Sequence, residues 1–542
     1  MCRVRFLAAG IVALLVGTGV AAQAPLTPKA LPERLAIVPA TSNSVGGCRL
    51  GDATLDLNEG NVRARLYNTG GLFWRGGNPT YEVPKDSRVQ SIFAAGIWVG
   101  GTVDGELRFA GADYADWEWW PGPLDDDGAA PADCATFDRI WSIVRKSDGS
   151  LTGDIADWPT DLGAPFEDDD GDGVYEPENG ELPSVYGHQT AFWVMNDRGN
   201  VHRWSGAEPL GLTARVTAFS FRVGNPAFTF GTFYRYEFEN PNGYTIENTR
   251  FGFFTDGDLG DFTDDYVGSD STRGLAFIYN SDAVDGNEDD EFGSYGLEPP
   301  ALGVDILSGA AGALYYEDEV SVRGVPTSGA HAYDYLNFRF PDGTPLSTGG
   351  LGYNPDDPIA APTTWQWPGA PEERAFWSEF DLDGRGTANS ALDRRFVTVA
   401  EPFELGPGGR HTVDLALIWA QGSSFLDSVA DLRRFSDRVQ AAYDADNLLV
   451  PGDIPSNLLT LEVFPNPATT TMTISYVLPQ TGETSLAVYD VLGREVARFA
   501  NGVQAAGTYR IPLRAASLSS GTYVIVLEAG NVRETKIVTL LL

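Results

Sequence analysis

The residues best suited to chemistry form an acidic loop at positions 168–176, DDDGDGVYE. Carboxylates stand at the alternate positions Asp168, Asp170 and Asp172, and Val174 after the second glycine offers a backbone carbonyl. This order matches the first half of an EF-hand-type calcium loop, because calcium prefers several hard oxygen ligands, which clustered aspartates supply. The sequence therefore predicts a calcium site at Asp168, Asp170, Asp172, Val174 and Glu176, with a solvated acidic turn as the alternative.

The loop departs from the EF-hand pattern in its second half. Its twelfth position is Asn179, where the pattern has glutamate, although Glu178 and Glu181 lie close by. Pro165 and Pro177 flank the loop and exclude the two helices of an EF-hand. We therefore expect the calcium loop to lie in irregular structure and to order a long segment.

A second group of aspartates follows an expected strand at residues 249–255. Its members are Asp256, Asp258, Asp261, Asp264, Asp265 and Asp270. Acidic side chains at the end of a strand can converge on one cation, and we expect Asp256, Asp258, Asp264 and Asp265 to form a second metal site. The alternative for this group is a solvated loop. A weaker acidic run at residues 285–291 is predicted to be a solvated turn.

Signatures of catalytic nucleophiles are missing from the sequence, which has no G-x-S-x-G, H-E-x-x-H or P-loop motif. The four histidines lie in different contexts without metal-ligand spacing. With 75 aspartates and glutamates, any two could be taken for the carboxylate pair of a glycosidase, so such a pair has no specificity. The sequence thus favours a protein without catalytic activity.

Two groups of tryptophans could stack on sugar rings. They are Trp117, Trp119 and Trp120 in the first group and Trp365 and Trp367 in the second. Tryptophans in β proteins more often lie in the core, and we expect both groups to be buried. Exposed rings would instead favour a polysaccharide-binding surface.

The fold class that the sequence predicts is mainly β. Short apolar runs broken by Gly, Pro, Asn and Asp indicate one or two β-sandwich-like domains with long acidic loops over residues 46–447, with a sub-boundary near 205–212. Alternation predicts strands at residues 62–67, 91–99, 212–223, 232–239 and 249–255. Two further strands, 395–399 and 412–419, flank a Gly-Pro-Gly-Gly turn and are predicted to form a hairpin.

One late helix completes the body. Ser424 is a good N-cap, and apolar residues then recur at spacings of three and four, from Phe425 and Val429 through Leu432 to Tyr443. The spacing predicts an amphipathic helix that packs on the preceding sheet. Residues 448–460, with two prolines, are expected to link the body to a separate C-terminal module.

The C-terminal module, residues 461–542, is predicted to be a small β-sandwich. Strand-forming residues concentrate at 473–478, 485–490, 521–527 and 535–541, with Gly, Pro and Asn in the breaks. The motifs FPNP, VYDVLGREV, AAGTYRIPL, LSSGTYVIVLEAG and TKIVTL occur in this order. Together they resemble the type A sorting domain of the Bacteroidetes type IX secretion system.

That resemblance implies export across the outer membrane by the type IX secretion machinery. It also implies removal of the module, followed by release of the protein or its attachment to surface lipopolysaccharide. An ordinary C-terminal β-sandwich used for binding is the alternative. The body, with motifs such as GIWVGG, QTAFWVMND and GPGGRHTVDLALIWAQG, resembles an uncharacterised group of type IX cargo and implies no activity.

The N-terminus agrees with export. Arg3 and Arg5 precede an apolar run and a small-residue cleavage site, so residues 1–24 are predicted to be a cleaved signal peptide and residues 25–45 a flexible segment. Elsewhere the sequence has no uncharged apolar stretch of the length that a membrane span needs. The expected location is extracellular or on the outer-membrane surface.

Removal of the signal peptide leaves two cysteines, Cys48 and Cys134. The exterior is oxidising, so these are candidates for one disulfide, with two buried thiols as the alternative. A single bridge cannot hold a chain of this length, so the fold must depend on a hydrophobic core.

The net charge of −38 excludes one class of partner. Residues 25–457 carry −40, because residues 1–24 contribute +2 and residues 458–542 sum to zero, and such a body should repel nucleic acid and anionic membranes. Calcium and a hydrated surface both account for the acidity. We therefore expect an exported, calcium-stabilised protein with a structural, adhesive or ligand-binding role and a glycan or protein ligand. The alternative is a carbohydrate-active enzyme or a polysaccharide-binding protein.

Overall fold

The computed structural model describes residues 51–540 with gaps. The gaps are at 52, 77–78, 115–117, 134, 223–224, 287–292, 358, 446–447, 449–459, 465, 467, 469–470, 479–480, 506, 515–517 and 530–531. The expected signal peptide, the segment 25–45, nearly all of the linker 448–460, Trp117, Cys48 and Cys134 therefore lie outside the described residues. Among the described residues, no helix is both long and apolar enough to span a membrane.

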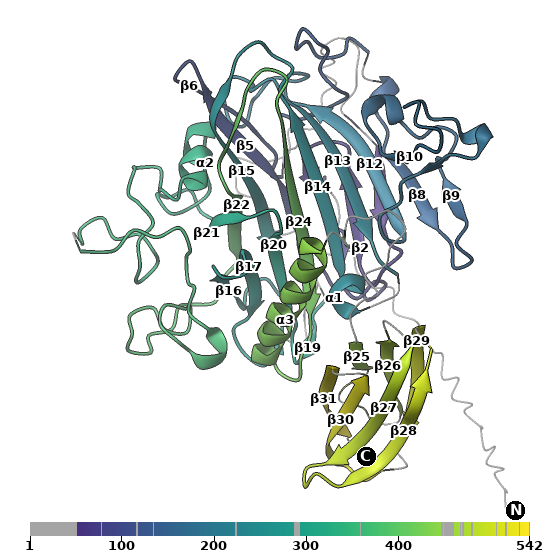
Figure 1. Ribbon diagram of the computed structural model, residues 1–542. Coiled ribbons are helices and arrows are strands. Elements are labelled where there is room, and N and C mark those ends of the chain that lie inside the picture. Colours follow the sequence, from purple (N-terminus) through teal and green to yellow (C-terminus); the bar gives the residue numbers. More distant parts are fainter. Residues whose placement is uncertain are drawn as a thin grey trace, which may run out of the picture.

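Two large antiparallel sheets form the body (Figure 1). The first sheet has the order β1, β2, β3, β5, β15, β22, β21, with β4, β6 and β23 paired at its sides. Its strands are β1 (Thr54–Leu57), β2 (Arg63–Tyr67), β3 (Gly71–Leu72), β4 (Tyr81–Glu82), β5 (Ala94–Val103), β6 (Glu106–Gly111), β15 (Ile246–Gly257), β21 (Ala310–Tyr316), β22 (Arg394–Ala400) and β23 (Phe403–Leu405).

The second sheet has the order β16, β17, β20, β24, β14, β13, β12, β8, β9, with β7 paired to β12. Its strands are β7 (Trp120–Pro121), β8 (Trp141–Arg145), β9 (Leu151–Gly153), β12 (Gln189–Asn196), β13 (Thr213–Ser220), β14 (Gly231–Glu239), β16 (Asp265–Asp270), β17 (Leu275–Asn280), β20 (Ala301–Ile306) and β24 (Arg410–Ala420). Two short hairpins, β10 (Phe166–Glu167) with β11 (Leu182–Pro183) and β18 (Val284–Asp285) with β19 (Gly296–Leu297), lie outside both sheets.

The main core lies between the two sheets. Strand β15 presents Phe251 and Phe253 to the aromatic residues of β14, with ring centroids 5.6 Å apart for Tyr236 and Phe251 and 6.5 Å apart for Tyr234 and Phe253. These side chains alternate along each strand, as a pleated strand with one face toward a core requires. The mainly β architecture is therefore confirmed as a face-to-face sandwich.

The helix α3 (Phe425–Asp444) covers the outer face of the second sheet at β17, β20 and β24 (Figure 1). The Ser424 side chain caps the helix by accepting a hydrogen bond from the Asp427 backbone N–H at 3.1 Å. Val429, Leu432 and Val439 are fully buried against strands of this sheet. Each such side chain contributes about 1.5–3 kcal/mol of burial free energy. The predicted late helix is confirmed.

A shorter helix, α2 (Gly329–Leu336), covers the outer face of the first sheet. Leu336 packs on Gly252 of β15, where a Cβ atom would lie 2.3 Å from the leucine Cδ2. Glycine at this position therefore lets the helix approach the sheet. The other helices among the described residues are α1 (Pro226–Thr229) and the 3-10 turns Ala135–Phe137, Thr160–Leu162, Pro177–Asn179 and Pro371–Glu373.

The predicted hairpin of residues 395–399 and 412–419 is wrong. Strand β22 pairs with β15 and β21 in the first sheet, while β24 pairs with β14 and β20 in the second. The glycine-rich turn thus belongs to a connection that passes from one sheet to the other. The sub-boundary predicted near residues 205–212 falls in the connection between β12 and β13. These two strands pair over eight residues in the second sheet, so the chain stays within one sheet at this point.

The C-terminal module is a small sandwich, drawn in yellow in Figure 1. One sheet contains β25 (Thr460–Phe464), β26 (Thr471–Leu478) and β29 (Gly507–Arg514), and the other β27 (Gly482–Asp490), β28 (Glu495–Gln504), β30 (Gly521–Ala529) and β31 (Val532–Leu540). Tyr476, Leu486, Ile525 and Leu540 form part of its own core. The four predicted strands are present, and β25, β28 and β29 were not predicted.

Candidate functional site

The predicted calcium loop joins β10 to β11. Pairing of Phe166 with Pro183 brings the two ends of the loop together. The Tyr175 ring packs on Phe166 with centroids 5.4 Å apart, and its hydroxyl donates to the Ile155 carbonyl at 2.8 Å. These contacts fix the loop over a small cluster of buried residues on the outer face of the second sheet, which includes Trp158 and Phe192.

Three carboxylates of this loop come together. Oxygen atoms of Asp168, Asp170 and Glu181 all lie within 4.8 Å of one another. Asp168 also accepts hydrogen bonds from the backbone N–H groups of Gly171 at 2.8 Å and Gly173 at 2.9 Å. Both glycines have φ of 78°, which is the left-handed region that glycine adopts without strain. The glycines therefore make the turn that brings the carboxylates together.

Glu181 occupies the place that the sequence pattern leaves open at Asn179. It is buried and accepts from the backbone N–H groups of Asp169 at 3.2 Å and Glu176 at 2.8 Å. Asn179 lies in a 3-10 turn and donates to the Glu176 carboxylate at 2.6 Å instead. Glu181, two positions beyond Asn179, thus reaches the carboxylates of the loop, because the 3-10 turn Pro177–Asn179 lies between them.

The rest of the predicted ligand set lies outside this three-carboxylate group. Asp172 accepts from the Val174 backbone N–H at 2.7 Å, and the Val174 side chain is 57% exposed. Glu176 is engaged by Asn179. The loop therefore joins Asp168 and Asp170 of the predicted set with Glu181, and leaves Asp172, Val174 and Glu176 at its rim.

The second predicted set divides into two parts. Asp256 and Asp258 lie at the end of β15, and their carboxylate oxygens are within 4.8 Å of each other and of Asp393, which precedes β22. The buried Arg395 forms ion pairs in this group, at 3.5 Å with Asp256 and 3.4 Å with Asp393. Asp393 is the member that sequence reasoning missed, because it lies far along the chain.

Asp264 and Asp265 lie at the start of β16. Asp264 accepts from the Asn280 amide at 2.7 Å and from the Gly286 backbone N–H at 3.0 Å. Burial raises the pKa of Asp264 to about 6. Asp265 is fully buried, and burial together with the Asp264 charge raises its pKa well above the ordinary value. Burial therefore disfavours the charged form of both carboxylates, because a charged group is less stable away from water.

Asp285 is not part of a solvated turn, so the prediction for this residue is wrong. It is 1% exposed and accepts from the Asp261 backbone N–H at 2.9 Å. Burial raises its pKa to about 7. Pairing of β18 with β19 places Asp285 against the Asp261 backbone, and the sequence gives no local sign of this contact.

The described tryptophans of both predicted groups lie mainly in the core. Trp119, Trp120 and Trp367 are 0%, 3% and 4% exposed, and Trp365 is half-buried against the main core. Trp367 packs on Tyr315 with centroids 5.5 Å apart. The core interpretation is confirmed for the three buried rings, which cannot form a solvent-facing platform for sugars.

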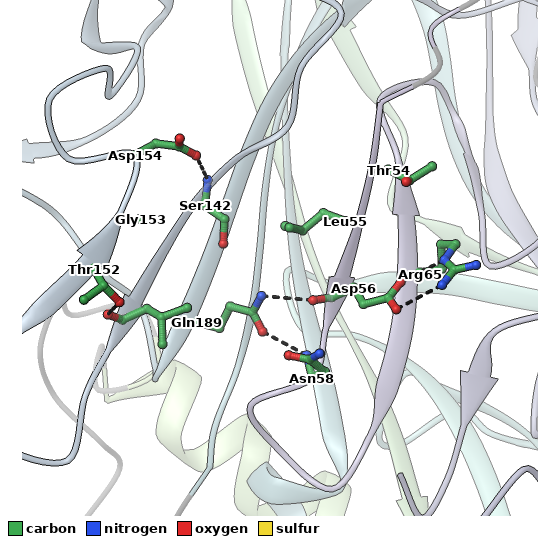
Figure 2. A pocket seen from close by; sticks show the side chains of 11 residues that line it. Thr54, Leu55, Asp56, Asn58, Arg65, Ser142, Thr152, Gly153, Asp154 and Gln189 are labelled. Carbon is green, nitrogen blue, oxygen red and sulfur yellow. Dashed lines mark hydrogen bonds and ion pairs between the residues drawn. The ribbon is translucent and has the colours of Figure 1, made fainter. Parts of the chain in front are cut away.

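A polar groove of about 610 Å³ lies between β1 of the first sheet and β8 and β9 of the second (Figure 2). On one wall Arg65 holds Asp56 in a two-pronged ion pair, with N–O distances of 2.8 and 3.0 Å. On the other wall Asp154 accepts from the Ser142 backbone N–H at 2.8 Å and from Arg139 at 2.6 Å.

Gln189 joins the two sheets at the floor of the groove. It donates to the Asp56 carbonyl at 3.0 Å and accepts from the Asn58 backbone N–H at 2.8 Å. The residues that line the groove come from strands far apart in the sequence and form no motif. Sequence reasoning therefore missed the groove, and no local signal could have found it.

The comparisons with known proteins concern mainly the C-terminal module. Residues 462–540 match the family described as the secretion system C-terminal sorting domain. No curated protein matches the chain.

Two solved structures share remote similarity with the chain. One is a polysaccharide lyase, with 8% identity, a TM-score of 0.18, and coverage of 82% of this chain and 46% of that one. The other is PorZ, an essential surface component of the type IX secretion system of Porphyromonas gingivalis, with 10% identity, a TM-score of 0.13, and coverage of 89% and 56%. The chain thus spans about half the length of each, and these scores carry no argument about its function.

The order of motifs, the small sandwich and the family match agree for the C-terminal module. The protein is therefore a type IX secretion cargo with a C-terminal sorting domain, which is exported to the cell surface or beyond.

Proposed function

We propose that the exported body is a calcium-stabilised β-sandwich with a structural, adhesive or ligand-binding role. The observation that carries this proposal is the grouping of Asp168, Asp170 and Glu181 within 4.8 Å. Three carboxylates at this separation repel one another, and a divalent cation between them would turn that repulsion into attraction. Oxygen ligands alone, on a loop with exposed edges, suit calcium and its water ligands.

Calcium at this loop would have a mechanical role. The loop covers the buried cluster around Trp158 and Phe192, and its ends are held by a short hairpin of two paired residues on each side. A short hairpin alone is marginally stable, so the cation would supply much of the order of this segment. Binding to the folded state alone raises stability by mass action.

Thermal unfolding in millimolar calcium and in EDTA tests the proposal. We expect calcium to raise the unfolding temperature by several degrees, because a cation bound only to the folded protein contributes about 2.7 kcal/mol at a hundredfold excess over its Kd. In Asp170→Asn this increase should shrink. Asp148→Asn, a change at an exposed turn aspartate, is the matched control and should behave as the unchanged protein.

Two results would count against the loop site. One is an unfolding temperature that is the same in calcium and in EDTA. The other is a calcium response that Asp170→Asn leaves at full size, which would show that the cation binds elsewhere.

A polysaccharide-binding role is the second candidate, and the polar groove between β1 and β8–β9 favours it. Asp56, Asp154 and Gln189 present acceptors and donors there, which suits the hydroxyl groups of a sugar chain. Arginines hold both carboxylates in ion pairs, so we propose binding and no acid catalysis. A glycan array should then give signals that Arg65→Ala and Asp154→Ala abolish, and a blank array would remove this candidate.

The proposal includes the fate of the sorting domain. We infer that the module is removed after export and that the body is released or attached to lipopolysaccharide. Mass spectrometry of the protein from the medium and from washed cells would identify the new C-terminus and any attached lipopolysaccharide. Recovery of the intact module in both fractions would contradict removal.

A further inference from the structure

We propose that a second divalent cation binds in the interior of the body, between Asp256, Asp258, Asp393 and Asp265. Asp256 belongs to β15, Asp258 follows β15 directly, and Asp265 begins β16, whereas Asp393 precedes β22 far along the chain. The inference goes beyond the calcium loop, because it concerns other residues and holds whether or not that loop binds calcium.

The register of β15 and β22 assembles the first three ligands. Asp256 pairs with Arg395 and Gly257 with Arg394 in this antiparallel ladder, so continuing the register places Asp393 opposite Asp258. Residues at alternate positions of a strand share a face, and hence Asp256 and Asp258 point to the same side. Their carboxylate oxygens and those of Asp393 lie within 4.8 Å of one another.

The charge in this group is out of balance. The guanidinium of Arg395 is 1% exposed and forms ion pairs with Asp256, Asp393 and Asp318, the last at 2.8 Å. Among the described residues, the Arg395 guanidinium thus pairs with three carboxylates, and Asp258 adds a fourth carboxylate to the group. Burying an excess of negative charge is costly unless a cation or protons compensate it. A divalent cation would restore the balance.

Asp265 supplies the independent observation that points to a ligand. It is fully buried, and its Oδ1 atom has no hydrogen-bond partner among the residues that the structure describes. Its Oδ2 atom accepts from the Leu259 backbone N–H at 3.2 Å, so the carboxylate lies against the peptide that follows Asp258. Buried polar atoms are rarely without partners, and a lone carboxylate oxygen here calls for a cation.

The ligand chemistry identifies the class of cation. The four side chains offer only hard carboxylate oxygens, which suit calcium better than metals that prefer nitrogen or sulfur. Asp256 lies in β15 and Asp393 directly precedes β22, both strands of the first sheet, whereas Asp265 begins β16 of the second. A cation held by all of them would therefore join the two sheets at this end of the sandwich.

Counting bound calcium in the full chain tests the inference. After equilibrium dialysis, we expect two calcium ions per chain by elemental analysis. Asp170→Asn should lose the loop ion and retain one. Asp258→Asn with Asp265→Asn should lose the buried ion and retain one. Asp282→Asn, which changes an exposed aspartate near the same end of the sheet, should retain both.

Terbium luminescence provides a second readout that leaves the ligands unchanged. Tyr114 donates to Asp256 at 2.6 Å, so its ring lies close enough to sensitise a bound terbium ion. In Asp170→Asn, sensitised emission should persist, and Tyr114→Phe should then reduce it severalfold. Loss of all bound metal in Asp170→Asn would overturn the buried site while leaving the loop site intact. Retention of both ions in the double variant would also overturn it.

Discussion

At the scale of single residues, Asp305 of β20 couples pH to the packing of α3. Its carboxylate is fully buried and accepts a hydrogen bond from the Ser436 hydroxyl of the helix at 2.6 Å. Its pKa is raised to about 7, mainly by burial and also by the charges of Asp437 and Asp270, while the Ser436 hydrogen bond and Arg273 act in the opposite direction. The folded protein therefore favours the neutral form of this side chain.

The sign of the pH effect follows from this shift. An unfolded aspartate has a pKa of about 3.9, so between roughly pH 4 and pH 7 the folded state binds more protons at Asp305 than the unfolded state. The contribution of Asp305 to stability is therefore present at low pH and is lost as pH rises through this window, by a few kcal/mol in order of magnitude. Asp305→Asn cannot ionise and should lack this loss.

Urea unfolding of both proteins at about pH 5 and about pH 8, in EDTA, measures the difference. We expect Asp305→Asn to gain stability relative to the unchanged protein as pH rises. Asp148→Asn, at an exposed turn, should keep a constant offset. A parallel pH dependence for Asp305→Asn and the unchanged protein would show that Asp305 titrates normally in the folded state.

The same scale shows why only part of the metal sites could be predicted. Asp168 and Asp170 are neighbours in a motif whose spacing alone brings them together. Glu181 joins them through a 3-10 turn, and Asp393 joins Asp258 through strand pairing, so neither contact has a local signal. The prediction grouped Asp264 and Asp265 with Asp256 because they are close in sequence. The structure brings Asp265 to the peptide after Asp258 from the first residue of β16 in the other sheet, while Asp264 bonds to Asn280 and Gly286.

At the scale of elements, local periodicity predicted where helices and strands form better than it predicted which strands pair. Apolar residues at spacings of three and four predicted α3, because such residues share the one helical face that packs on the sheet. The alternation of β14 predicted its strand: Tyr234, Tyr236 and Phe238 face the first sheet, and on the other face Phe233 is buried near α1 whereas Arg235 and Glu237 are half-buried. The pairing of β22 and β24 failed because partner choice depends on residues far away in the sequence.

A truncation in α3 tests how much this helix contributes. Leu432 is fully buried against the second sheet, so Leu432→Ala should lower the free energy of unfolding by about 2–5 kcal/mol through lost burial and a cavity. The same change at Leu392, which is 53% exposed, is the matched control and should cost less than about 1 kcal/mol. Equal losses in the two variants would mean that α3 is not packed as described.

At the scale of the whole molecule, the sequence predicted a β-rich body and a separate sorting module. The body and the module have separate hydrophobic cores. An ion pair between Arg438 of α3 and Glu534 of β31, at 3.1 Å, joins the two parts, and such partly exposed pairs contribute little. The proposed cation ligands all lie in the body.

Calcium should therefore act on one part of the molecule alone. Scanning calorimetry of the full chain should resolve two transitions, because each part has its own core and weak coupling does not merge them. Adding EDTA should lower the temperature of the larger transition and leave that of the smaller one in place. Arg438→Ala should leave both within about a degree, since it removes only a partly exposed pair. A single transition that moves as a whole with calcium would show instead that the sorting domain folds as part of the body.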